Sequence, residues 1–539
     1  MPGCSAPLEP HRPHRYNKRV KNAHATAPRR ELAPGLRRFL LFTATTTGAA
    51  VMIIEILGAK LLAPYFGTSH FVWTAQIGVT LLALAAGYAA GGWLADTSPR
   101  LAWIYGGIAA AGVWLCVSVP VAEPAAYFCL RFSLPVGSLL GALLLFFVPL
   151  ALLAMVGPFF ARMLTATLEN VGRIVGRLIS LGTLGSVAGT VLISYVLIPR
   201  LANSVTMYAC AAALLVVAAI YFAIWERKAL PPVLFFGGLG AFGGFIGAAQ
   251  PMLAMKPGWH ELYRGNSNFG MLQVIEDDSG QRRYYLNDLL TQNSYEPQTR
   301  QSVSLFSYML YGLAQTYAVE TRDVLCIGMG VGIVPMQFAR EGANVQVVEI
   351  NPAVVPLAEK YFDFEPAKVH LAIGDGRQFV TLTTNRYDVI LLDAFLGESP
   401  PSHLMTREAF AAMRRCLKPG GVLVMNAFGD FETGKDFMIA SLARTLGAVF
   451  ASQRIHASGN GNVFLVGSDQ PELTVRRGMD FARVPEVVRV GAEDAFNSRI
   501  SVDPAHGQVL TDDFNPVEFR DAANREELRR RLALSYRPR

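Results

Sequence analysis

The chain has 539 residues, of which 52% are hydrophobic and only 17% are charged, a composition that excludes an ordinary soluble protein. Its formal net charge of +7 lies entirely in residues 1–38, which carry nine basic and two acidic residues. The rest of the chain is neutral overall, with 39 basic and 39 acidic residues. The charge therefore indicates a basic N-terminal tail of disordered composition rather than a nucleic-acid partner.

Residues 39–250 consist of long apolar runs, each near the ~20 residues that a helix needs to cross a bilayer. They predict a helical membrane bundle of about seven spans, near 39–61, 71–95, 101–122, 135–157, 175–198, 204–225 and 231–250. Small residues recur at helical spacing within the runs and predict closely packed helices, namely Gly87, Gly91, Gly182, Gly185 and Gly189. We expect an integral multi-pass protein of a bacterial inner or cell membrane, with the lipid bilayer as a partner.

Basic residues concentrate in the tail, in the 158–174 loop and after the sixth span, a bias that places the N terminus in the cytoplasm. Seven full crossings then put the C-terminal half on the opposite side. The glycine-rich run at 231–250 leaves a re-entrant segment open as an alternative. Glu55 lies inside the first span, where a carboxyl group is costly, and either makes a structural contact or binds a ligand.

The C-terminal half has a different pattern. Residues 258–300 predict a small subdomain built on a β-hairpin, residues 301–520 predict an α/β domain, and residues 521–539 predict a basic tail. Within the second segment, strand-like and helix-like runs alternate from residue 323 to residue 426, which predicts a mainly parallel Rossmann-like sheet of the methyltransferase type.

Three successive predicted strand ends carry residues that suit a nucleoside. The first is followed by Gly328, Gly330 and Gly332 at a helix start, the second ends in Glu349, and the third is followed by Asp375 and Gly376. Glycines let the backbone approach a ligand, and an acid at the second strand end can accept hydrogen bonds from ribose hydroxyls. The six cysteines are scattered and have no metal-ligand spacing, so no metal site is predicted.

Residues 369–401, Glu349 and the glycine loop resemble spermidine synthases, and residues 40–96 resemble the helical region of membrane-fused members of that family. The resemblance implies transfer of an aminopropyl group from decarboxylated S-adenosylmethionine, or use of S-adenosylmethionine itself, with a putrescine-like amine as acceptor. By resemblance, Glu349 binds the ribose, Asp375 and Gly376 the adenine, and Gln292 the thioether region of the donor. Tyr308 is expected to line the acceptor pocket.

The sequence departs from that family at two acidic positions, which are Val331 and Leu396 here. Asp393, Glu398 and His403 are the remaining candidates for activating the amine, and Asp512 or Asp513 is a possible replacement acid from the C-terminal segment.

Three functions stay open at this point. The first is aminopropyl transfer, the second is methyl transfer from S-adenosylmethionine without polyamine specificity, and the third is a transporter or sensor of polyamines or other small solutes with a nucleoside-binding regulatory domain. No nucleic-acid partner is expected, because no basic patch with interleaved aromatics occurs in the α/β half. A homo-oligomer is possible.

Overall fold

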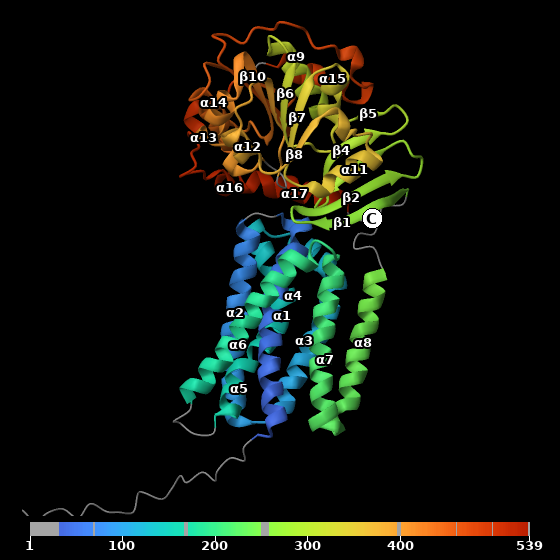
Figure 1. The fold of residues 1–539 in the computed structure, drawn as a ribbon, viewed down its shortest axis with the longest axis vertical. Coiled ribbons are helices and arrows are strands. Elements are labelled where there is room, and N and C mark those ends of the chain that lie inside the picture. Colours follow the sequence, from blue (N-terminus) through green and yellow to red (C-terminus); the bar gives the residue numbers. More distant parts are fainter. Residues whose placement is uncertain are drawn as a thin grey trace, which may run out of the picture.

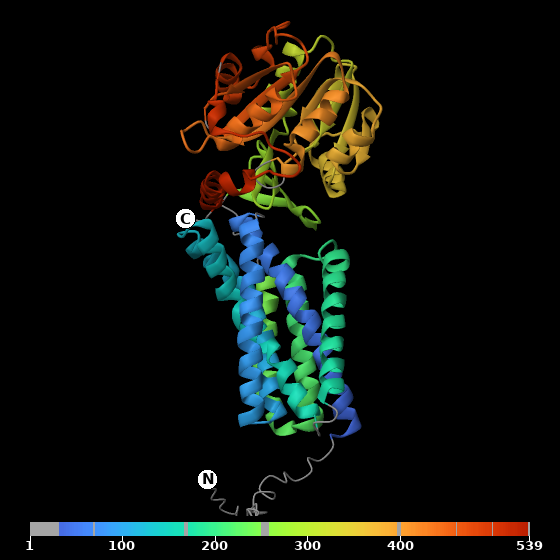
Figure 2. The same cartoon turned by 90° about the vertical axis from the view of Figure 1, so that its left-hand side faces the viewer.

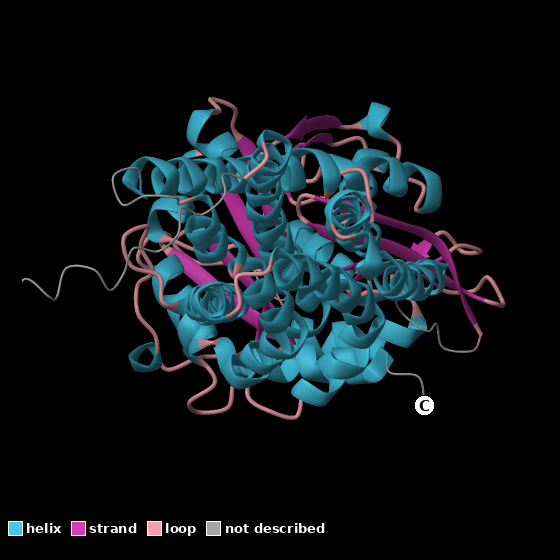
Figure 3. Ribbon diagram, turned by 90° about the horizontal axis from the view of Figure 1, so that it is seen from below, coloured by secondary structure: helices cyan, strands magenta, loops and turns pink. Residues whose placement is uncertain are grey.

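The computed structural model describes residues 32–67, 70–165, 171–249, 258–395, 400–459, 461–498 and 500–536. A long helical bundle forms one end of the molecule and the α/β half forms the other (Figures 1 and 2). Viewed along the bundle, the bundle helices project over the strands of the α/β half (Figure 3). The two halves are therefore stacked end to end.

The bundle contains α1 (Pro34–Phe66), α2 (His70–Thr97), α3 (Leu101–Cys129), α4 (Leu134–Ala154), α5 (Val156–Leu164), α6 (Val171–Leu192) with a π-helical extension Ile193–Leu197, α7 (Asn203–Trp225) and α8 (Leu230–Ala249). Six segments of the described chain are long and apolar enough to cross a membrane, and α8 is outside these six. The chain runs along the bundle seven times, since α4 and α5 form one passage. The start of α1 and the end of α8 consequently lie at opposite ends (Figure 1).

Glycines bring the backbones of neighbouring bundle helices into contact, as the small-residue spacing predicted. A Cβ atom on Gly87 of α2 would overlap the carbonyl oxygen of Ala151 in α4, and one on Gly185 of α6 would overlap that of Thr45 in α1. Such close approach gives the helices a large van der Waals contact along their small residues.

The small β subdomain is larger than the predicted hairpin. Five antiparallel strands lie in sequence order: β1 (Trp259–Ser267), β2 (Gly270–Asp277), β3 (Arg283–Asn287), β4 (Leu290–Glu296) and β5 (Gln301–Ser302). Asp288 and Leu289 turn the chain between β3 and β4 with positive φ angles of 45° and 66°. Asp288 holds this turn in place, because its carboxylate accepts a hydrogen bond from the Met271 N–H at 2.9 Å.

The α/β half is built on a seven-stranded sheet in the order β11-β12-β10-β9-β6-β7-β8. Strands β8, β7, β6, β9 and β10 are parallel neighbours, whereas β12 pairs antiparallel with both β10 and β11. The sheet is thus mixed at one edge. Its strands are β6 (Asp323–Ile327), β7 (Asn344–Glu349), β8 (His370–Ile373), β9 (Tyr387–Leu392), β10 (Leu417–Gly429), β11 (Ser452–Ala457) and β12 (Gly461–Ser468).

Helices cover both faces of this sheet, and two apolar clusters fill the space between the layers. The sequence pattern located α10, α11 and α13 within about two residues, because their apolar periodicity is strong. The helices are α9 (Leu305–Tyr317), α10 (Ile333–Arg340), α11 (Val355–Tyr361), α12 (Gly376–Leu382), α13 (Arg407–Arg415), α14 (Phe437–Gly447), α15 (Glu486–Asn497), α16 (Val517–Arg520) and α17 (Ala522–Tyr536).

The segment predicted as a basic tail at 521–539 instead forms helix α17 over its described part. Arg529 in this helix is only 3% exposed. Its Nη1 donates to the carbonyl oxygen of Asp288 in the β subdomain at 2.9 Å and to that of Pro64 in α1 at 3.5 Å. A basic residue is therefore buried here because backbone carbonyls of two other domains accept its hydrogen bonds.

We expect Arg529→Ala to destabilise the junction between the two halves by about 1–3 kcal/mol, because two buried carbonyl groups lose their donor. Thermal unfolding and limited proteolysis of the full chain in detergent measure this loss. Arg530→Ala is the matched control, since the neighbouring side chain is exposed. Equal unfolding temperatures for the two variants would contradict the bridging role of Arg529.

Candidate active site

The glycine loop after β6 forms a tight turn at the carboxyl edge of the sheet. Gly328, Gly330 and Gly332 have φ angles of 90°, 54° and 83°, a region that side chains rarely adopt. A Cβ atom on Gly328 would also overlap the carbonyl oxygen of Asp393 on the neighbouring strand end. The loop therefore needs glycine both for its conformation and for its contact with β9.

Glu349 ends β7 beside this loop. Its Oε2 accepts a hydrogen bond from the Met329 N–H at 3.0 Å, and its Oε1 accepts one from the Asn351 N–H at 2.8 Å. Burial raises the pKa of Glu349 despite these two bonds. Each carboxylate oxygen has further lone pairs, so the group can still accept hydrogen bonds from a pair of sugar hydroxyls.

Asp375 caps the N terminus of α12 after the third strand end. Its Oδ1 accepts a hydrogen bond from the Gln378 N–H at 2.9 Å, and its Oδ2 lies 2.9 Å from His403 Nε2. Burial acts to raise the pKa of Asp375, but these bonds outweigh it and the pKa is lowered. The structure thus pairs His403, a candidate base, with the acid predicted to bind adenine.

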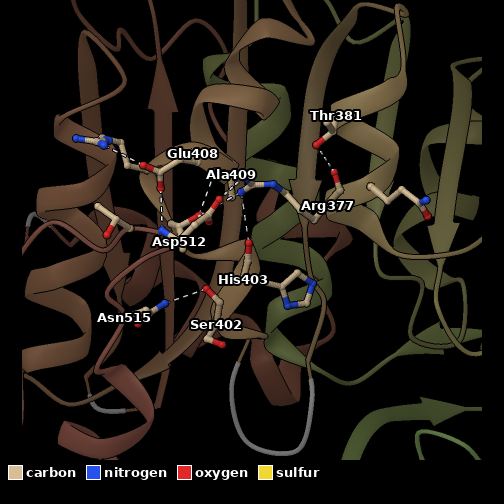
Figure 4. A network of polar contacts seen from close by, with 12 residues as sticks. Arg377, Thr381, Ser402, His403, Glu408, Ala409, Asp512 and Asn515 are labelled. Carbon is tan, nitrogen blue, oxygen red and sulfur yellow. Dashed lines mark hydrogen bonds and ion pairs between the residues drawn. The ribbon is translucent and has the colours of Figure 1, made fainter.

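A polar network fixes the segment that carries His403 (Figure 4). Arg377 Nη2 lies 2.8 Å from Asp512 Oδ2, and Thr406 Oγ1 donates to Asp512 Oδ1 at 2.6 Å. Asn515 Nδ2 donates to the Ser402 carbonyl oxygen at 2.9 Å. Asp512 is one of the replacement acids that the sequence offers for the reaction, but both of its carboxylate oxygens are engaged in holding this segment.

A cavity of about 260 Å³ lies over the carboxyl edge of the parallel strands. Eight of the predicted site residues line it: Gln292, Gly328, Gly330, Glu349, Asp375, Gly376, Asp393 and His403. The first seven of these come from four strand ends and the β subdomain, as expected when parallel strands end at one edge. We call it the donor cavity.

The wall of the donor cavity also contains residues that sequence reasoning missed. Phe66, Gly67 and Leu134 come from the end of the helical bundle, and Glu518, Ala522, Arg525 and Glu526 come from the C-terminal helices. No local pattern marks these residues, because they reach the cavity only through the stacking of the two halves.

A second cavity of about 240 Å³ shares Gln292, Gly330, Asp393 and Phe395 with the donor cavity. Its wall is completed mainly by β4, the start of α9, and the ends of β10 and β12. We call it the acceptor cavity. Asp393 therefore stands at the junction of the two cavities.

Asp393 is held by a chain of amides. Asn426 Nδ2 donates to Asp393 Oδ1 at 2.9 Å, and Asn462 Nδ2 donates to Asn426 Oδ1 at 3.0 Å. Desolvation raises the pKa of Asp393 to about 6, although the Asn426 bond opposes the shift. A carboxylate with a pKa near 6 is a stronger base than an ordinary one and is still ionised at pH 7. The two asparagines were absent from the sequence-predicted site.

The remaining predicted residues lie elsewhere. Gly332 packs against Phe364 and lies in the wall of neither cavity, and the Tyr308 hydroxyl donates to the Ser302 carbonyl oxygen at 2.7 Å, outside both walls. Burial raises the pKa of Tyr308 to about 12. Glu398 lies outside the described residues, as does Leu396.

Val331 replaces an acid of the resembled family but does not lie in the wall of either cavity. Its side chain is fully buried in the apolar core of the α/β half. Within the described residues, no group of three metal-ligating side chains that could hold a metal ion is found.

Parts of the chain match known proteins. Residues 304–457 match the family model described as the spermine/spermidine synthase domain. Similar curated proteins include a polyamine aminopropyltransferase of Vibrio vulnificus, 43% identical over 36% of this chain and 69% of its own length, and a probable polyamine aminopropyl transferase of Bifidobacterium longum, 28% identical over 38% and 50%. A solved structure of a probable spermidine synthase from Corynebacterium glutamicum is 18% identical, with a TM-score of 0.36, over 47% of this chain and 97% of its own.

We expect Glu349→Gln to weaken the binding of methylthioadenosine by about 10- to 100-fold, because the amide nitrogen cannot accept hydrogen bonds that a carboxylate oxygen accepts. Isothermal titration of the full chain measures the dissociation constant. Glu359→Gln on the exposed surface of α11 is the control. If both variants bind the nucleoside like the unaltered chain, Glu349 is not a ribose ligand.

Proposed function

Because the chain belongs to the spermidine synthase family of polyamine aminopropyltransferases, we propose that it is a membrane-anchored transferase that moves an aminopropyl group from decarboxylated S-adenosylmethionine to an amine. Glu349, Asp375 and Gly376 bind the nucleoside of the donor in this proposal, and Gln292 lies next to its sulfonium. The amine acceptor binds in the acceptor cavity.

The observation that carries the proposal is the position of Asp393. It is shared by the walls of both cavities, and its pKa of about 6 suits a general base near neutral pH. A donor and an acceptor bound in the two cavities meet at this carboxylate, which is the geometry that a direct transfer requires.

The reaction then follows from the chemistry of a sulfonium. Asp393 accepts a proton from the acceptor ammonium, and the freed nitrogen lone pair attacks the aminopropyl carbon bonded to sulfur. The carbon–sulfur bond breaks, its electron pair stays on sulfur, and methylthioadenosine leaves as a neutral thioether. The positive charge moves from sulfur to the attacking nitrogen and is spread over both in the transition state, so a weakly polar wall, such as that formed by Phe395 and Leu134, favours the step.

Methyl transfer from S-adenosylmethionine is the second candidate, and the side chain of Val331 favours it. An apolar residue in the core cannot counter the ammonium of an aminopropyl donor, whereas S-adenosylmethionine carries its own carboxylate beside its ammonium. A polyamine transporter or sensor with a nucleoside-binding domain is the third, in which Glu55 belongs to the solute path.

One experiment separates these functions. The full chain in lipid nanodiscs is titrated with decarboxylated S-adenosylmethionine, S-adenosylmethionine and methylthioadenosine, and products are then analysed with putrescine present. We expect binding of the decarboxylated donor and an aminopropylated product. A methylated product would support the second candidate, and binding without any product would support the third. Absence of all nucleoside binding would overturn the enzyme proposal.

The pH dependence of turnover tests the role of Asp393. A base with a pKa of about 6 is protonated and inactive below that pH, so kcat/KM rises as the pH increases through 6. Asn426→Ala removes the donor that stabilises the carboxylate. The pKa of Asp393 then rises further, and the acidic limb of the profile moves to higher pH. An unmoved limb would show that another group is the base.

We propose that the bundle lies in a bacterial inner or cell membrane with the N terminus in the cytoplasm. Basic residues near the described helix ends support this orientation. Eight lie at the end away from the α/β half, namely Arg37, Arg38, Arg100, Arg162, Arg173, Arg177, Arg227 and Lys228, against three at the near end, namely Lys60, Arg131 and Arg200. Seven passages then put the α/β half outside the cytoplasm, where its donor must be supplied.

A C-terminal fusion to alkaline phosphatase or to a fluorescent protein measures the orientation in a bacterial host. The bias of basic residues toward the N-terminal end of the bundle predicts a C terminus outside the cytoplasm. The phosphatase fusion is then active, and the fluorescent fusion does not fluoresce. This result would require a source of donor outside the cytoplasm. A fluorescent fusion without phosphatase activity would contradict the orientation and would give the site direct access to a cytoplasmic donor.

A further inference from the structure

Asn293 is a buried amide in the wall of the acceptor cavity that the proposed reaction does not yet use. It lies in the middle of β4, opposite Tyr285 of β3, and is 3% exposed. Residues 290–294 of β4 all contribute to the cavity wall. The side chain is therefore held by a sheet rather than by a loop.

The Oδ1 atom of Asn293 has no hydrogen-bond partner among the residues that the structure describes. A buried acceptor without a donor costs free energy, so native structures usually satisfy it with protein, water or ligand. The N–H of the next residue, Ser294, already donates to Ser304 Oγ at 2.9 Å. The amide oxygen of Asn293 therefore stays open toward a bound molecule.

The position of the oxygen points to the kind of molecule. A Cβ atom built on Gly330 would lie 2.7 Å from Asn293 Oδ1, so the oxygen abuts the glycine loop at a residue that lines both cavities. Asp393 lines the same junction. A chain that extends from a nucleoside in the donor cavity passes between these two groups when it enters the acceptor cavity.

We propose that Asn293 is a ligand-binding residue whose amide oxygen accepts a hydrogen bond from the ammonium group of the donor's aminopropyl chain. This assignment rests on the proposed function. An ammonium group is a strong donor and pairs well with a buried amide oxygen. The pairing holds the cationic end by a dipole, which leaves Asp393 free to accept a proton from the acceptor.

Two ligands isolate this contact. Decarboxylated S-adenosylmethionine carries the aminopropyl ammonium, whereas methylthioadenosine has the same nucleoside and lacks that chain. The ratio of their dissociation constants therefore measures how the protein binds the charged aminopropyl group, because effects on the nucleoside cancel. Isothermal titration of the full chain in nanodiscs measures both constants for each variant.

Asn293→Leu removes the acceptor atom and Asn293→Asp adds a negative charge at nearly the same volume. We expect the leucine variant to raise the dissociation constant of decarboxylated S-adenosylmethionine by about tenfold or more. The dissociation constant of methylthioadenosine is expected to change by less than about twofold. The aspartate variant is expected to bind decarboxylated S-adenosylmethionine more tightly, relative to methylthioadenosine, than the unaltered chain does. Asn287→Leu, in the donor cavity, is the control and is expected to affect both ligands equally.

An unchanged ratio in both Asn293 variants would overturn the proposal. A change confined to the KM of the acceptor amine would also overturn it, since the oxygen would then face the acceptor instead of the donor. If the leucine variant does not fold, the aspartate variant still decides through the same ratio. Failure of the unaltered chain to bind either nucleoside would instead count against the proposed function itself.

Discussion

The carboxyl edge of the parallel sheet must be covered, and the rest of the molecule is arranged around that constraint. This edge carries the glycine loop, Glu349 and Asp393, which are polar groups that need both a ligand and shelter from bulk water. Helix α17 and the end of the bundle supply the cover. The buried guanidinium of Arg529 joins them, because it donates to carbonyl groups of α1 and of the β subdomain at once.

This cover explains the chemistry of the site. Desolvation at the junction of the two cavities raises the pKa of Asp393 to about 6, and the amides of Asn426 and Asn462 fix the direction of its carboxylate. The bundle takes part in the site, since Phe66 and Leu134 form part of the wall around the donor cavity.

The departures from the family pattern acquire a structural meaning in this arrangement. Val331 packs in the core instead of facing the donor, and Asp512 is engaged by Arg377 and Thr406, so neither supplies a charge to the cavities. Neutral amide side chains lie next to Asp393 at the junction of the two cavities. Asn426 donates a hydrogen bond to Asp393, and Asn293 adds an amide oxygen to the wall of the acceptor cavity without a second carboxylate beside Asp393.

Much of this protein could be predicted from the chain alone. The apolar runs, the positions of β6 to β10 and the residues at three strand ends that line the donor cavity are local patterns, and parallel strands that end at one edge bring such residues together. The antiparallel β11 and β12, the folding of residues 522–536 as a helix over the site, and the use of Arg529 and Asn293 depend on contacts between segments far apart in sequence. Only tertiary packing decides which of those polar side chains is buried and which oxygen stays open to a ligand.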